Sequence, residues 1–111
     1  MLAVSLLSMT DEAPEFDDHV QQLADLFSLL GDVTRLRIVL TCLDRPTSVG
    51  DIAAQLGLSS SLVSHHLRLL RGARLLRGER KGKKMFYSAL DDHVECVIDD
   101  MRAHVAEPAG S

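Results

Sequence analysis

Two short helical segments separated by a tight turn constrain the fold of this chain more than any other feature. Ser48 and Asp51 form an S-x-x-D capping signal for a helix that ends before Gly57, and a second helix starts close to Ser59. Two short helices joined in this way are typical of a helix-turn-helix, whose second helix enters the major groove of DNA with its N-terminal residues. The sequence therefore predicts a DNA-binding motif in the middle of the chain.

The distribution of charge supports the same interpretation. Residues 59–87 carry eight Lys and Arg residues against Glu79 alone, although the chain as a whole has a net charge of −4. Residues 1–58 carry three Arg against nine acidic residues, and residues 88–111 carry one Arg against six. Positive charge concentrated in this way is the electrostatic footprint of a surface that faces DNA.

A short β-hairpin is predicted after the second helix of the motif. Apolar segments at residues 75–76 and 85–87 flank a turn at Lys81 and Gly82, and basic residues surround that turn. We expect a basic tip that lies along DNA phosphates or in the minor groove.

The N-terminal part of the chain is predicted to be helical. Apolar positions recur at helical spacing in residues 17–30, which end at Gly31. Asp32 then caps another helix that runs to about Leu43.

The length and composition indicate one small domain. With 111 residues, no Trp, one Tyr and three Phe, the core must be mostly aliphatic. We expect a flexible N-terminal arm at residues 1–16, the folded domain at residues 17–107 and a tail at residues 108–111. No apolar run is long enough to span a bilayer, and the apolar start lacks the flanks of a signal peptide, so a cytoplasmic protein with no membrane partner is expected.

Potential metal ligands gather at both ends of a last helix, predicted from Asp92 to about Ala106. Asp92 and Glu95 form its capping signal, and Pro108 closes its far end. Four side chains of ligand type flank or occupy this helix: Asp91, His93, His104 and Glu107.

The spacing of these four side chains predicts a site shared between two chains. His93 and His104 return to nearly the same side of the helix but lie ~16 Å apart along its axis, whereas zinc holds its ligands at roughly 2.0–2.2 Å. In an antiparallel pair of helices, the Asp91/His93 end of one chain would meet the His104/Glu107 end of the other, which gives two equivalent sites in a homodimer. Two imidazoles and two carboxylates suit tetrahedral Zn²⁺ and tolerate Co²⁺, while Ni²⁺ would need further ligands. A solvated acidic helix that happens to carry two histidines is the alternative.

The order of elements and the local sequence motifs resemble those of the ArsR/SmtB family of metal-sensing winged-helix repressors. The resemblance covers nearly the whole chain and rests on three phrases, of which the V-S-H-H-L run from Val63 to Leu67 is the most characteristic: LFSLLGDVTRLRIVLTCL, SVGDIAAQLGLSSSLVSHHLRLLRGARLL and RKGKKMFYSAL. It implies a mainly α fold with a small β-hairpin, a homodimeric winged helix-turn-helix in the order ααααββα.

The resemblance also implies roles for particular residues. Contacts to bases or backbone would come from the second helix of the motif, where the candidates are Ser59, Ser60, Ser61, Ser64, His65 and Arg68. Phosphates would be contacted from the hairpin by Arg80, Lys81, Lys83 and Lys84. Zinc sensors of the family place D-x-H and H-x-x-E/H on the last helix with the separation seen here, which favours the quartet as a metal site.

One departure from the family pattern narrows the range of ions that could act as the inducer. Sensors of arsenic, cadmium and lead usually carry cysteine in a C-V-G-D phrase, where this chain has Ser48 in S-V-G-D. Without soft ligands there, arsenite and lead become poor candidates. Cys42 and Cys96 lie in the second and last predicted helices, displaced from the positions of a redox pair, and are interpreted as buried apolar residues.

The function expected from these features is metal-responsive repression rather than catalysis. The chain has no Gly-rich phosphate loop and no G-x-S-x-G, and four protein ligands would close the coordination sphere that a metal hydrolase needs open. The resemblance implies that the metal-free dimer binds operator DNA and that Zn²⁺, or Co²⁺ or Ni²⁺, releases it to derepress efflux or sequestration genes. Two alternatives stay open: a thiol-responsive repressor that uses Cys42 and Cys96, and a winged-helix protein with no metal input.

Overall fold

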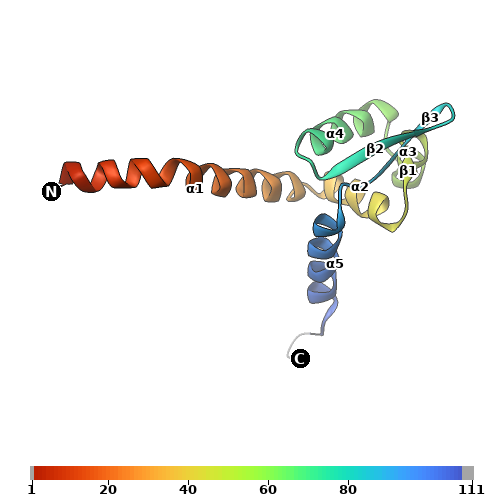
Figure 1. Cartoon of the computed structure of the whole chain (residues 1–111). Helices are drawn as coiled ribbons and strands as arrows, with labels where there is room; N and C mark the ends of the chain where they lie inside the picture. Colours follow the sequence, from red (N-terminus) through yellow and green to blue (C-terminus); the bar gives the residue numbers. More distant parts are fainter. Residues whose placement is uncertain (1, 109–111) are drawn as a thin grey trace.

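The chain folds as a mainly helical winged helix-turn-helix with a small antiparallel sheet, in a computed structural model that describes the backbone of residues 2–108 and the side chains of residues 16–108 (Figure 1). The predicted order of four helices, a hairpin and a last helix is confirmed, with one short strand added. The elements are α1 (Leu2–Leu30), α2 (Val33–Asp44), β1 (Thr47–Ser48), α3 (Val49–Leu56), α4 (Ser60–Gly72), β2 (Leu76–Lys81), β3 (Lys84–Ala89) and α5 (Asp92–Ala106).

The core is aliphatic, as the composition predicts. Helices α2, α3 and α4 bury branched side chains against one another and against the start of β2, and Tyr87 is the one aromatic residue of this core within residues 16–108. The fully buried side chains are Ile38, Val39, Cys42, Ile52, Val63, Leu67, Leu70 and Leu76. This packing fixes α4 to the body of the domain and leaves its opposite face in solvent.

Side-chain caps begin four of the helices. Asp32, Ser48 and Ser59 each accept a hydrogen bond from the backbone N–H three residues later, which satisfies a donor that the first helical turn leaves unpaired. For α5 the predicted cap at Asp92 is wrong by one residue, because Asp91 accepts from the N–H of Val94 at 3.1 Å.

Left-handed residues end both helices of the helix-turn-helix. Gly57 has φ +68° after α3, where glycine carries no steric cost. Arg74 has φ +62° after α4, and the N–H of Leu75 donates to the carbonyl of Leu70 at 2.9 Å, as in a Schellman motif. A non-glycine residue therefore holds the strained position that turns the chain from α4 into β2.

The sheet has three strands in the order β1-β3-β2. Lys81 pairs with Lys84, so the hairpin turn is made by Gly82 and Lys83, one residue later than predicted. Positive φ at Gly82 alone fits a type II′ turn, whose hand matches the twist of the strands. Strand β1 was not predicted; Thr47 pairs with Tyr87 and joins the helix-turn-helix to the wing.

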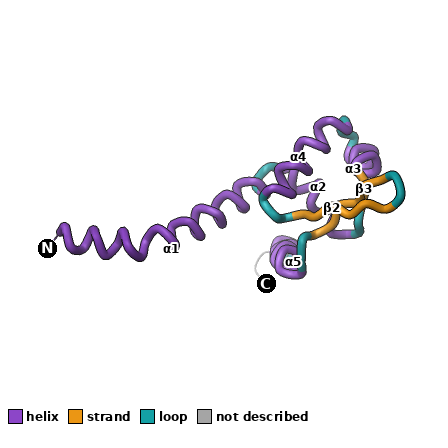
Figure 2. The backbone as a smooth tube through the Cα atoms, turned by 45° about the horizontal axis from the view of Figure 1, so that its top comes forward, coloured by secondary structure: helices purple, strands orange, loops and turns teal. Residues whose placement is uncertain are grey.

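Helices α1 and α5 extend away from the winged domain in different directions (Figures 1 and 2). The backbone of α1 is helical from Leu2, so the segment predicted as an arm at residues 1–16 continues the helix, and its flexibility stays a prediction. The predicted tail begins at Pro108 and otherwise falls outside the described residues. Across the part of the chain that the structure describes, no helix is both long and apolar enough to cross a membrane.

Candidate DNA-binding surface and metal-binding residues

Helix α4 presents one polar face to solvent. Val63, His66, Leu67 and Leu70 face the core, which turns the opposite side of the helix outward. All of the residues predicted to contact DNA from this helix are exposed: Ser59, Ser60, Ser61, Ser64, His65 and Arg68. Ser59 differs from the others because its hydroxyl accepts from the N–H of Leu62 at 3.1 Å, so it also caps the helix.

The wing carries the basic residues predicted for its tip. Arg80 and Lys81 end β2, Lys83 lies in the turn and Lys84 begins β3, and all four side chains are exposed. None of them forms an ion pair with a side chain in residues 16–108. Their charge is therefore free to meet phosphates.

Beneath the exposed face of α4, His66 is a buried histidine only 9% exposed. Its Nδ1 has no hydrogen-bond partner among the described residues. Burial is the main cause that lowers its pKa; the positive charges of Arg35 and His65 act in the same direction and Asp32 opposes them. Burial and the nearby positive charges therefore favour the neutral form of this imidazole, which lies on the core-facing side of α4.

The first pair of predicted metal ligands lies together at the start of α5. Oδ2 of Asp91 is 3.5 Å from Nδ1 of His93, and Oδ1 of Asp91 accepts from the N–H of Val94. This backbone hydrogen bond is the main cause that holds the pKa of Asp91 below its usual value, and His93 adds to it. An ionised carboxylate oxygen and an imidazole therefore converge where α5 begins, with 95% of the His93 side chain exposed.

The second pair of predicted ligands lies at the opposite end of the same helix. His104 is in the last turn of α5, and the N–H of Glu107, the C-cap, donates to the His104 carbonyl. Both side chains are exposed. Within residues 16–108, no three His, Cys, Asp or Glu side chains of one chain come close enough to hold a metal ion. A complete site made from the quartet would require a second chain.

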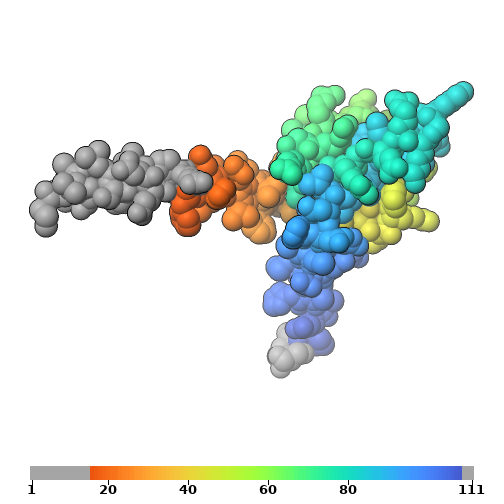
Figure 3. Space-filling view, viewed as in Figure 1, coloured from red at the N-terminus to blue at the C-terminus, as the bar shows by residue number. Residues whose placement is uncertain are grey.

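An uncovered apolar face lies between the two ligand pairs and continues onto α1. Val97 and Met101 of α5 are 51% and 56% exposed, and Phe27 of α1 is 61% exposed. With α2, these helices border an open apolar hollow of about 490 Å³. Figure 3 shows the C-terminal part of α5 projecting beyond the domain. A contiguous exposed apolar face of this kind is typical of an interaction site.

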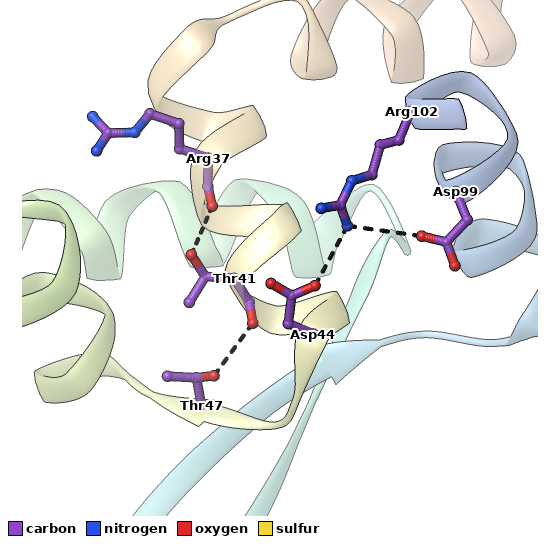
Figure 4. A network of polar contacts seen from close by, with 6 residues as sticks. All are labelled: Arg37, Thr41, Asp44, Thr47, Asp99 and Arg102. Carbon is purple, nitrogen blue, oxygen red and sulfur yellow. Dashed lines mark hydrogen bonds and ion pairs between the residues drawn. The ribbon is translucent and has the colours of Figure 1, made fainter. Parts of the chain in front are cut away.

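Arg102 links α5 to the winged domain (Figure 4). Its Nη1 lies 3.4 Å from Oδ1 of Asp44 and 3.9 Å from Oδ1 of Asp99. At the same end of α2, the Thr47 hydroxyl lies 3.5 Å from the Thr41 carbonyl. Sequence reasoning missed Arg102, although it is the only Lys or Arg in residues 88–111, a signal that could have found it.

The two cysteines occupy different environments, and the interpretation of both as buried is wrong for one of them. Cys42 is buried in the core, where desolvation raises the pKa of its thiol to about 12. Cys96 is exposed on α5 because it lies off the face that Ile98 buries.

Comparison with known families and relatives gives one consistent result. Residues 32–77 match the model of the bacterial regulatory proteins of the arsR family. The transcriptional repressor SmtB homolog of Synechocystis is 39% identical over 90 residues, which are 81% of this chain and 68% of the relative. The HTH-type transcriptional regulator NmtR of Mycobacterium tuberculosis is 35% identical over 92 residues, which are 83% of this chain and 77% of NmtR.

Solved structures support the likeness in fold. The solution structure of apo-NmtR has a TM-score of 0.73 and 32% identity, covering 86% of this chain and 80% of that one. A homodimeric winged helix-turn-helix DNA-binding domain from Mycobacterium bovis has a TM-score of 0.78 and covers 83% of this chain and 85% of its own. Its identity is 20%, so it bears on the fold alone.

Proposed function

The chain belongs to the ArsR family of bacterial regulatory proteins, which are transcriptional regulators and not enzymes, and from this premise we propose that it is a metal-responsive repressor. In this proposal a metal-free homodimer binds operator DNA, and zinc, or cobalt or nickel, releases it. The observation that carries the proposal is the convergence of Asp91 and His93 at one end of an exposed helix that carries His104 and Glu107 at the other.

The proposed dimer places a second copy of α5 against the uncovered apolar face. Val97, Met101 and Val105 are exposed along α5, and burying them would gain roughly 25 cal/mol for each Å² removed from water. This apolar face lies between the two ligand pairs. If it packs against the same face of a second, antiparallel α5, the start of each α5 lies beside the end of the other. A two-fold axis then produces two equivalent sites.

The chemistry of the four side chains fits zinc. Each site would combine Asp91 and His93 of one chain with His104 and Glu107 of its partner, a set of two nitrogen and two oxygen donors that suits a tetrahedral ion. Oδ1 of Asp91 is engaged by the helix start, which leaves Oδ2 as the oxygen directed toward His93 and available to a metal. Bound there, the metal would supply a cross-link between the two α5 helices.

DNA binding is assigned to α4 and the wing. The exposed serines, His65 and Arg68 of α4 would meet the major groove, and the four basic residues of the wing would meet phosphates. In a dimer the two copies of α4 must match half-sites about one DNA turn apart.

Metal binding can control DNA binding because α5 makes the proposed dimer contact and is also linked to the DNA-binding domain. Ligation by the Asp91/His93 and His104/Glu107 pairs would hold the two α5 helices at one crossing angle and thereby change the separation of the two α4 helices. If the bound metal lowers the affinity of the protein for DNA by some factor, thermodynamic linkage requires that bound DNA lowers its affinity for the metal by the same factor.

A thiol-responsive repressor is less well supported. Cys42 is buried with a raised pKa, and the thiolate is the reactive form of cysteine. The two cysteines also form no disulfide in the structure.

Titration of the purified protein with Co²⁺ tests the metal site, because tetrahedral Co²⁺ absorbs visible light strongly. We expect intense absorption that saturates at one Co²⁺ per chain and is displaced by Zn²⁺. His104→Ala and Asp91→Asn should lose it, and the asparagine variant keeps an oxygen that can cap α5. His19→Ala, which removes an exposed histidine of α1, is the control that should retain it. Equal absorption in all four proteins would contradict the proposed site.

A further inference from the structure

A second concave surface lies on the DNA-binding side of the domain, between α4 and β3. It is an open hollow of about 450 Å³ bordered by Ser64, Arg68, Arg71, Gly72 and Tyr87. Two guanidinium groups and two hydroxyl groups border it, and no carboxylate of residues 16–108 does. We call it the Arg71 hollow.

Three of these side chains come from one face of α4. Ser64, Arg68 and Arg71 are spaced four and three residues apart, which places them in a row along the helix. All three are exposed, and neither arginine forms an ion pair with any side chain in residues 16–108. The row extends the predicted DNA-contacting face toward the C-terminal end of α4.

Tyr87 closes the hollow from the sheet, and its position depends on the residue opposite. Tyr87 pairs with Gly78 across the hairpin, and a Cβ atom at Gly78 would lie 3.2 Å from Cε1 of the tyrosine ring. The glycine thus leaves room for the ring. Tyr87 as a whole is only 9% exposed, but its hydroxyl is not among the fully buried unpaired atoms and makes no hydrogen bond to a described residue, so it can donate to a ligand in the hollow.

We propose that the Arg71 hollow is a binding site for a phosphate of the DNA backbone, with Arg71 and Tyr87 as contacts beyond the predicted recognition helix and wing tip. This inference rests on the proposed DNA binding. A guanidinium group offers paired donors that match phosphate oxygens, and hydroxyl groups of Ser64 and Tyr87 complete a set of donors around one anion. Because Arg71 lies near the end of α4, this contact fixes the angle of the helix in the groove without reading a base.

The absence of acids distinguishes this hollow from the other large polar one. The hollow under α2 and α5 is lined by Arg45 and Arg77 but also by Asp44, Asp91, Asp92 and Glu95, whose negative charge would repel phosphate. A concave surface with cations alone focuses positive potential on its occupant.

Fluorescence anisotropy at a series of salt concentrations tests the proposal. The probes are a labelled duplex from upstream of the chain's own gene and a scrambled duplex of the same length. The proteins are the wild type, Arg71→Gln, Tyr87→Phe and Arg37→Gln, the last removing an equal charge from an exposed position on α2. Thermal unfolding of each variant confirms that it is folded.

We expect Arg71→Gln to weaken binding to both duplexes by about tenfold at low salt. The slope of log affinity against log salt should become shallower by about one, because one phosphate contact is lost. Tyr87→Phe should weaken binding several-fold with an unchanged slope, since it removes a neutral donor, and Arg37→Gln should match the wild type.

Either of two results would overturn the assignment. Arg71→Gln that behaves like Arg37→Gln would exclude the arginine, and Tyr87→Phe with wild-type affinity would exclude the tyrosine. Both leave the proposed repressor intact, provided that the wild type binds its upstream duplex more tightly than the scrambled one. A wild type that binds neither duplex would instead contradict the proposed function itself.

Discussion

Nη1 of Arg102, in α5, lies 3.4 Å from Oδ1 of Asp44, at the end of α2, although the two residues are 58 positions apart in the sequence. The chain leaves α2 at Asp44 and reaches Ser48, the cap of α3, so the ion pair ties the proposed metal-binding helix to the helix-turn-helix. The side chains of Arg102 and Asp44 are 47% and 66% exposed, and such pairs contribute roughly 0–1 kcal/mol to stability.

Breaking this ion pair should weaken the coupling between metal and DNA. In the proposed mechanism zinc lowers the affinity of the wild type for DNA by some factor, and we expect Arg102→Gln and Asp44→Asn each to reduce that factor by up to about fivefold. The free energy of unfolding should change by less than about 1 kcal/mol. The double variant should lose no more than either single variant, because one interaction is removed. Asp100→Asn, an equal change of charge at an exposed position on α5, is the control. Additive losses in the double variant would show that the two residues act separately.

The buried His66 should make stability depend on pH. Its pKa is lowered by burial below the usual value, so the unfolded chain binds a proton more readily than the folded one. Stability is therefore full above about pH 6.5 and is lost as pH falls toward the lowered pKa. Urea unfolding at about pH 7.5 and pH 5.5 should give a smaller pH dependence in His66→Gln than in the wild type. The lowered pKa values of Asp32 and Asp91 stabilise the fold above their usual value of 3.8, and this stability is lost only as pH falls below it, outside the range of the two unfolding measurements. Equal dependence in both proteins would refute this account of His66.

Relieving the backbone strain at Arg74 should stabilise the fold. Arg74 has φ +62° and an exposed side chain, so Arg74→Gly removes the left-handed penalty at little other cost. We expect the free energy of unfolding to rise by about 0.5–1 kcal/mol, after the added entropy of glycine in the unfolded chain. Gly57→Ala, at φ +68° with open space around the new Cβ, should lower it by a similar amount. Urea midpoints measure both, and a destabilised Arg74→Gly would contradict the Schellman assignment.

Thiol labelling should separate the two cysteines. Because burial raises the pKa of Cys42 to about 12 and Cys96 is exposed, iodoacetamide should add one group to the native protein and two in denaturant. Mass spectrometry of the peptides identifies the labelled residue. Rapid labelling of Cys42 in the native protein, or a disulfide between Cys42 and Cys96 after mild oxidation, would favour the thiol-responsive alternative.

The elements that sequence patterns predicted are those determined by local signals. Asp32, Ser48 and Ser59 cap their helices as the sequence indicates, and Gly57 makes the turn, because each signal acts within a few residues. Strand β1 was missed because Thr47 becomes a strand only by pairing with Tyr87, forty residues later in the chain. The hairpin turn was predicted one residue too early, because several adjacent basic residues fit either register.

The candidate metal site shows a different kind of limit. Spacing alone indicates that Asp91/His93 and His104/Glu107 lie too far apart to share an ion within one chain. The convergence of Asp91 on His93 depends on Asp91 acting as the helix cap, and the sequence pattern pointed to Asp92 instead. The link from Arg102 to Asp44 depends on where α5 lies relative to the end of α2, which no local pattern encodes.

The most direct test of the proposed function is the fluorescence anisotropy of labelled upstream DNA with the purified protein, titrated with Zn²⁺ in the wild type and in His104→Ala. We expect zinc to release the wild-type protein from DNA, whereas the variant should bind DNA equally well and stay bound. Retention of the wild type at saturating zinc, or equal release of the variant, would contradict a metal sensor built on the last helix.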